Sequence, residues 1–166
     1  MTHDDRFRDS DDLWRDFERT ATAPGGDAAL AHIPDDSDDL IRLVGEALRE
    51  KFDELPPLDE DRDYVLHHLG QQVWVHVDAE FPAITILARV AHGVYSRRST
   101  EVELGILNRQ HPLTRWVLGD RSIWQRSTLI ALPFAPAHLI LLLDQFFDTM
   151  SSTRDDLAYR TGAKVA

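Results

Sequence analysis

Apolar and polar residues alternate along this chain with two different periods, and these periods predict helices and strands in a definite order. A stripe with helical spacing begins after Ser37, the expected N-cap, and Asp38 and Asp39 supply carboxylates to the first turn. The apolar positions of this stripe are Ile41, Val44, Leu48 and Phe52. Pro56-Pro57 is expected to end the helix.

The pattern then changes to the two-residue period of strands. Three strands are predicted at residues 64–69, 72–79 and 83–91, and their connections are short enough for antiparallel neighbours. One face of the second and third strands is aliphatic and is expected to be buried: Val73, Val75, Val77, Ile84, Ile86, Ala88 and Val90. Trp74 and His76 therefore belong to the opposite face.

A second helix is predicted from a capping box formed by Thr100 and Glu103. Asn108 is expected to end it in left-handed geometry, and Pro112 prevents its continuation. The polar run Asn108-Arg109-Gln110-His111 holds side chains that enzymes use, so a catalytic loop is the alternative. Because each of these residues has a local reason to lie at a helix exit, the pattern favours the exit.

A hairpin and a long helix complete the predicted order. The hairpin strands are expected at residues 115–119 and 122–132, around Gly119-Asp120. Pro136 is well placed in the first turn of the last helix. The core stripe of that helix is expected at Leu139, Leu142, Leu143, Phe146, Phe147 and Met150. The order is helix, three strands, helix, two strands, helix, which is an α+β fold.

Length and composition indicate one globular domain. The 166 residues are 43% hydrophobic and 28% charged, and the chain contains no cysteine. A disulfide framework and a thiolate metal site are therefore excluded. The longest apolar run, residues 139–143, is far shorter than the roughly 20 residues that span a bilayer. These features predict a cytoplasmic protein without a membrane partner.

The net charge of −11 is concentrated near the beginning of the chain. Residues 1–39 contain 12 Asp or Glu and 4 Arg, whereas residues 40–166 contain 17 acidic and 14 basic residues. Residues 1–36 are expected to be a flexible acidic leader, in which Leu13, Trp14 and Phe17 could form one docking turn. The folded domain is expected at 37–162, followed by a tail at 163–166. An acidic surface repels phosphate backbones, so a nucleic-acid partner is disfavoured.

A search for catalytic and metal-binding patterns finds none. Asp59 to Asp63 resembles the start of a calcium loop, but Tyr64 stands where glycine is needed and Gly70 where glutamate is needed. The eight histidines show no metal-ligand spacing, and no serine lies in a nucleophile elbow. No catalytic residue, metal or cofactor is therefore expected.

Three segments resemble the type III secretion chaperones and the related YbjN-like proteins. The stretch "DRDYVLHHLGQQVWVHVDAEFPAITILARVAHGV" is similar to the first three strands of that family. "STEVELGILNRQHPLTRWVLGDRSIWQRSTLIA" is similar to its middle helix, which ends in a Leu-Asn pair, and to its hairpin. "FAPAHLILLLDQFFDTMSSTRDDLAYRTG" is similar to its last helix. The resemblance covers residues 38–162 and leaves the leader outside.

The resemblance implies a five-stranded, mainly antiparallel sheet packed on helices, and a non-catalytic protein that holds an extended or partly folded segment of a client protein, often as a homodimer. Trp74 and His76, opposite the valine stripe, and Trp124 and Arg126, which share a face of the last strand, are the candidate peptide contacts. The alternative for the tryptophans is a core or dimer role. Two other functions stay open: a small enzyme with a site of scattered His, Asp and Arg, and a structural or regulatory dimerisation module.

Overall fold

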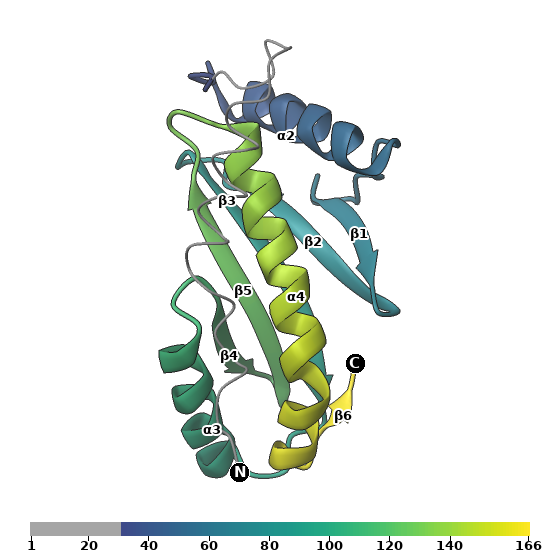
Figure 1. Ribbon diagram of the computed structural model, residues 1–166, viewed down its shortest axis with the longest axis vertical. Coiled ribbons are helices and arrows are strands. Elements are labelled where there is room, and N and C mark those ends of the chain that lie inside the picture. Colours follow the sequence, from purple (N-terminus) through teal and green to yellow (C-terminus); the bar gives the residue numbers. More distant parts are fainter. Residues whose placement is uncertain (1–30) are drawn as a thin grey trace, which may run out of the picture. The chain divides into compact units, whose positions relative to one another are not determined.

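The computed structural model describes residues 31–166, so the expectation for Leu13, Trp14 and Phe17 lies outside the described residues. The elements in this part are α2 (Ser37–Phe52), β1 (Tyr64–His68), β2 (Gln71–Val77), β3 (Ala83–His92), α3 (Arg97–Gln110), β4 (Arg115–Gly119), β5 (Ser122–Ile130), α4 (Pro136–Thr161) and β6 (Lys164–Val165) (Figure 1). The predicted order is confirmed, and one short strand is added at its end.

The strands form one sheet in the order β1-β2-β3-β5-β4, and every pairing among them is antiparallel. β5 lies beside β3, which places the β4 strand at one edge and β1 at the other. β6 pairs with Ala91 and His92 at the end of β3. This strand lies within residues 163–166, which were expected to be a tail. Two exposed residues carry no periodic pattern from which a strand can be predicted.

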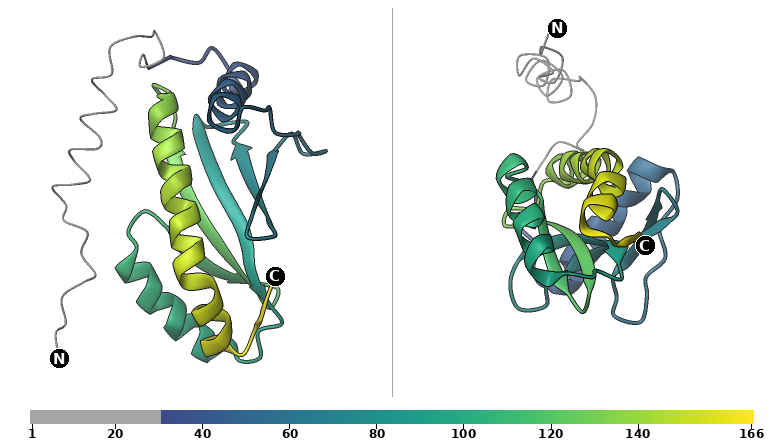
Figure 2. Two further views of the ribbon diagram at one scale, coloured as in Figure 1. Left: turned by 45° about the vertical axis from the view of Figure 1, so that its right-hand side comes forward. Right: turned by 90° about the horizontal axis from the view of Figure 1, so that it is seen from below.

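Helices cover one face of the sheet. α4 runs across β3 and β5, while α2 packs beside it toward β2 and α3 beside β4 (Figures 1 and 2). The aliphatic face predicted for β2 and β3 is buried under these helices, with residues such as Val75, Ile84 and Ile86 fully inaccessible. Alternate side chains of each strand point to the other face of the sheet, and no helix within residues 31–166 lies on that face (Figure 2).

The helix starts differ from the predicted caps. Asp36, not Ser37, caps α2, because its Oδ1 accepts a hydrogen bond from the Asp39 N–H at 2.8 Å. Ser96 caps α3, and Thr100 is a fully buried residue inside that helix, so the predicted capping box does not form. Asp and Ser are equivalent cap types, so sequence spacing alone does not choose between neighbouring candidates.

The two predicted exits also differ in detail. α2 ends at Asp53, whose φ of 58° is left-handed, before Pro56-Pro57 is reached. α3 continues through Gln110, so Asn108 is an ordinary helical residue and does not adopt left-handed geometry. The hairpin between β4 and β5 turns at Asp120 and Arg121, with φ values of 48° and 58°. Two consecutive positive φ values are typical of a tight two-residue hairpin turn.

Most of the predicted stripe of α4 is buried, with Leu139, Leu143, Phe146 and Met150 inaccessible. Leu142 and Phe147 are only half-buried and pack at the margin of the core, which corrects their place in the stripe. Before α2, the His32 and Phe134 backbones exchange two hydrogen bonds of 2.7 Å. This pairing lies outside the range 37–162 expected for the domain, whose bounds stay a prediction.

Candidate functional site

The sheet face opposite the helices is called the open face here and is defined by the outward residues of five strands: Val65, Trp74, His76, Leu87, Arg89, Arg115, Val117, Trp124, Arg126 and Thr128. These residues are exposed or half-buried, and no helix within residues 31–166 packs on them. The right-hand view of Figure 2 shows the helices together on the other side of the strands. A surface of this kind is available to a partner.

Two tryptophans lie side by side on the open face. The ring centroids of Trp74 on β2 and Trp124 on β5 are 6.1 Å apart and the rings are tilted by 45°. Leu87 on the intervening strand β3 is the direct cross-strand partner of Trp74. All three side chains are half-buried. They form an apolar centre that solvent still reaches, which is a common property of interaction surfaces.

Arginines surround this apolar centre. Arg89 on β3 lies opposite Trp124, and Arg126 on β5 lies opposite Leu87. Arg115 on the edge strand β4 lies opposite Arg126. Arg126 donates one long hydrogen bond to Thr85 Oγ1, at 3.4 Å. Within the described residues none of the three arginines has a carboxylate within ion-pair distance.

His76 lies on the same face, beyond Trp74 along β2. Its Nδ1 is 2.7 Å from Oδ1 of Asp63, the residue just before β1. The carboxylate therefore holds the imidazole in place at this end of the face. A shallow hollow of ≈ 320 Å³ lies at the other end, lined by His67, Gln72, Trp74, Arg89 and Ala166 among others.

The four predicted contacts, Trp74, His76, Trp124 and Arg126, all lie on the open face. The two tryptophans are half-buried, whereas Trp116 on β4 faces the helices and is 1% exposed. Sequence reasoning did not place Leu87, Arg89 and Arg115 among the candidate contacts. Alternation along each strand indicates which residues share a face with them. Only the pairing of β3 with β5 shows that they lie next to the tryptophans.

The enzyme alternative depended on a deep polar pocket that joins His68, His76 or His111 to a carboxylate. His76 does meet the carboxylate of Asp63, but its side chain is 43% exposed on the open face. His68 instead stacks on Phe147 of α4, with centroids 4.4 Å apart, and burial lowers its pKa. His111 packs edge-on against Trp116, and burial lowers its pKa as well. His68 and His111 therefore have separate packing roles. Within residues 31–166, no three His, Asp or Glu side chains are grouped as metal ligands.

The fold is shared with chains of several solved protein complexes. A chain of the ExsC-ExsE complex is 16% identical, with a TM-score of 0.60 over 73% of this chain and 95% of that chain. The HopA1-SchA chaperone-effector complex contains a chain that is 9% identical, with a TM-score of 0.58 over 74% of this chain and 99% of that chain. The complex of the Yersinia pestis type III secretion chaperone SycH with a stable fragment of YscM2 contains a chain that is 14% identical. Its TM-score is 0.53 over 68% of this chain and 98% of that chain.

Among curated proteins, none matches the sequence significantly. Across residues 31–166, no helix is both long enough and apolar enough to cross a membrane. A sequence profile does match residues 38–166, which include the whole sheet, α3, α4 and all of α2 except Ser37. The family of that profile is described as T3SS (YopN, CesT) and YbjN peptide-binding chaperone 1. With most of its length inside this match, the chain belongs to the T3SS and YbjN peptide-binding chaperone family.

Proposed function

We propose that this peptide-binding chaperone holds an extended segment of a client protein on its open face. The observation that carries the proposal is the half-buried Trp74–Trp124 pair, with Leu87 between the two strands, on a sheet face that no described helix covers. Large aromatic side chains that keep contact with water contribute strongly when a partner covers them. A client segment that covers this centre would therefore gain most of its binding energy there.

The similar structures support a protein client. One is the complex of ExsC with ExsE, one contains SycH with a fragment of YscM2, and one is the HopA1-SchA chaperone-effector complex. The proposal is one of binding without catalysis, and the separate packing of His68 and His111 supports it. A cytoplasmic location is part of the proposal, because a cysteine-free chain gains nothing from an oxidising compartment.

Trp74→Ala is expected to weaken capture of extended apolar peptides by more than about 1 kcal/mol, which is roughly fivefold or more in Kd. The reason is the loss of one of the two tryptophans of the apolar centre while the buried face of β2 stays intact. Fluorescence polarisation with labelled peptides measures the affinity, and thermal melting checks the fold. Tyr159→Ala is the matched control, because that aromatic side chain is 86% exposed on α4. Unchanged affinity in folded Trp74→Ala would place the client elsewhere.

We also propose that the protein forms a homodimer. Exposed apolar side chains on α3 and in the loop that follows it support this: Val102 is 61% exposed and Leu113 63%. Apolar surface of this kind is stabilised when a second copy covers it. Sedimentation velocity at micromolar concentration is expected to show a dimer, and Val102→Asp to shift it toward monomer. A wild-type species of 19.0 kDa would contradict the proposal.

A further inference from the structure

The open face carries a pair of like charges that has no internal explanation. Arg115 and Arg126 are direct cross-strand partners on β4 and β5. Side chains in this position lie roughly 5 Å apart at Cβ, and like charges there repel each other. Neither guanidinium has a carboxylate within ion-pair distance among residues 31–166. A negative group from outside this part of the protein would relieve the repulsion.

The two arginines end a row that crosses all five main strands. Consecutive cross-strand partners in this row are Val65, Trp74, Leu87, Arg126 and Arg115. The β1, β2 and β3 positions are apolar, and the β5 and β4 positions are cationic. Arg89 adds a third guanidinium in the neighbouring row, opposite Trp124. The row from Val65 to Arg115 is therefore divided into an apolar half on β1, β2 and β3 and a basic half on β5 and β4.

Two carboxylates at the ends of the strands that form this face already have partners. Asp63 Oδ1 lies 2.7 Å from His76 Nδ1. Asp78 follows β2, and its Oδ1 accepts from the backbone N–H groups of Glu80 and Phe81, both at 2.9 Å. The basic half of this row thus contrasts with the chain as a whole, whose net charge is −11. A partner that matches this face is more acidic than one that matches the average surface.

We propose that the client segment held by the open face is acidic, with a carboxylate seated between Arg115 and Arg126 and an apolar side chain against Trp74 and Leu87. This inference rests on the proposed function and specifies its client. Neighbouring strands are about 4.8 Å apart, so the midpoint of the two arginines lies roughly 7 Å from Leu87. Side chains i and i+2 of an extended segment are also roughly 7 Å apart. The preferred client pattern is therefore an apolar residue followed two positions later by Asp or Glu.

Nucleic acid is the other polyanion that arginines bind. A net charge of −11 repels a phosphate backbone as a whole, whereas a short acidic peptide meets only the local basic half. The apolar half also matches aliphatic side chains that a phosphate backbone lacks. The structure therefore favours the peptide, and the nucleic acid becomes an outcome of the test.

Three labelled extended peptides that differ at one position test the inference: Leu-x-Glu, Leu-x-Gln and Leu-x-Lys repeats of equal length. The full-length protein is expected to bind the Glu peptide about five- to tenfold tighter than the Gln peptide, and the Lys peptide weakest. Added salt should reduce this preference, because exposed charge pairs are screened. Fluorescence polarisation at two salt concentrations measures both effects.

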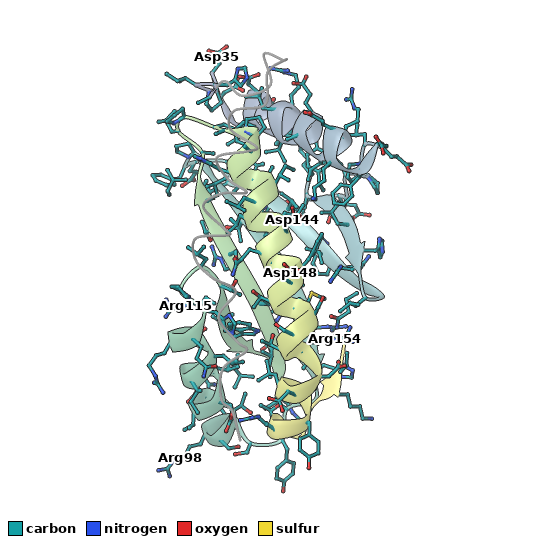
Figure 3. The ribbon with its side chains drawn as sticks, in the orientation of Figure 1. Asp35, Arg98, Arg115, Asp144, Asp148 and Arg154 are labelled. Atoms are coloured by element: carbon teal, nitrogen blue, oxygen red, sulfur yellow. The ribbon has the colours of Figure 1, made fainter. Side chains whose placement is uncertain are left out.

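Variants of Arg115 and Arg126 test whether these two residues cause the preference for the Glu peptide. The double variant Arg115→Gln/Arg126→Gln is expected to bind the Glu and Gln peptides equally, and Arg115→Glu/Arg126→Glu to prefer the Lys peptide. Arg98→Gln is the matched control, because Arg98 is exposed at the start of α3, away from Arg115 (Figure 3). Thermal melting checks each variant, and the single variant Arg126→Gln replaces any double variant that fails to fold.

Each outcome is decisive. Suppose that the wild-type protein binds the three peptides equally well and that Trp74→Ala weakens the binding of each. This result would overturn the acidic client and leave the proposed function standing. Failure of all three peptides to bind would overturn both. Displacement of the Glu peptide by an oligonucleotide at a lower concentration than by unlabelled Glu peptide would show that the basic half serves a nucleic acid instead.

Discussion

Phe146→Ala is expected to lower the free energy of unfolding by about 3–5 kcal/mol. Phe146 is fully buried where α4 faces the sheet, and its ring packs edge-on against Phe147 at 6.4 Å. Its backbone carbonyl also accepts a hydrogen bond from Gln125 Nε2 of β5, at 2.9 Å. Removing the ring leaves a cavity that the helix cannot close without disturbing this buried contact. The cost therefore combines lost transfer energy with a residual cavity.

Denaturant titration followed by circular dichroism measures this change. Leu141→Ala is the control in the same helix, because that side chain is 49% exposed and its loss should cost much less. Leu142→Ala should fall between the two, since Leu142 is half-buried at the core margin. A Phe146→Ala protein as stable as Leu141→Ala would mean that α4 presents a different side to the sheet.

Asn108→Leu is expected to destabilise the fold by roughly 2–3 kcal/mol, because it removes two hydrogen bonds from one strand. The Asn108 Oδ1 accepts from the Trp116 N–H at 2.8 Å, and its Nδ2 donates to the Trp116 carbonyl at 3.1 Å. Both backbone groups belong to β4, an edge strand, and they point toward α3 and away from β5. The side chain of Asn108 therefore takes the place of a neighbouring strand. Leucine has a similar volume but leaves both groups without a partner.

Two further variants separate this explanation from a general helix effect. Gln110→Leu changes an exposed residue of the same helix and is expected to be nearly neutral. Asn108→Asp keeps an acceptor for the Trp116 N–H but places a negative oxygen against the carbonyl, so its stability should be well below that of wild type. If Asn108→Leu unfolded at the wild-type denaturant concentration, the bond pair would not be what holds β4 to α3.

The candidate site was partly predictable for a simple reason. The two-residue period of a strand assigns alternate side chains to opposite faces, so Trp74 and His76 had to lie opposite Val75 once β2 was recognised. The face to which Trp124 and Arg126 belong could not be assigned from the sequence, because nothing near β5 in the sequence shows which side of that strand meets the helices. The pairing of β3 with β5 settled it.

Asn108 shows why local cues can mislead. Asparagine before Pro112 is a common helix ending, and its actual partner, Trp116, lies on another element. Similarly, Leu142 and Leu143 are both compatible with the apolar stripe of α4, and only the orientation of that helix on the sheet buries one more than the other. Both decisions depend on contacts between elements.

The sequence by itself determined the order of the main elements and the two faces of β2 and β3, because helical and strand periods are local properties of the chain. The resemblance of three segments added the family. Only the tertiary structure decided the row from Val65 to Arg115, the role of Asn108 and the short strand β6. Register between strands far apart in sequence depends on how whole elements pack, and no short stretch of residues encodes it.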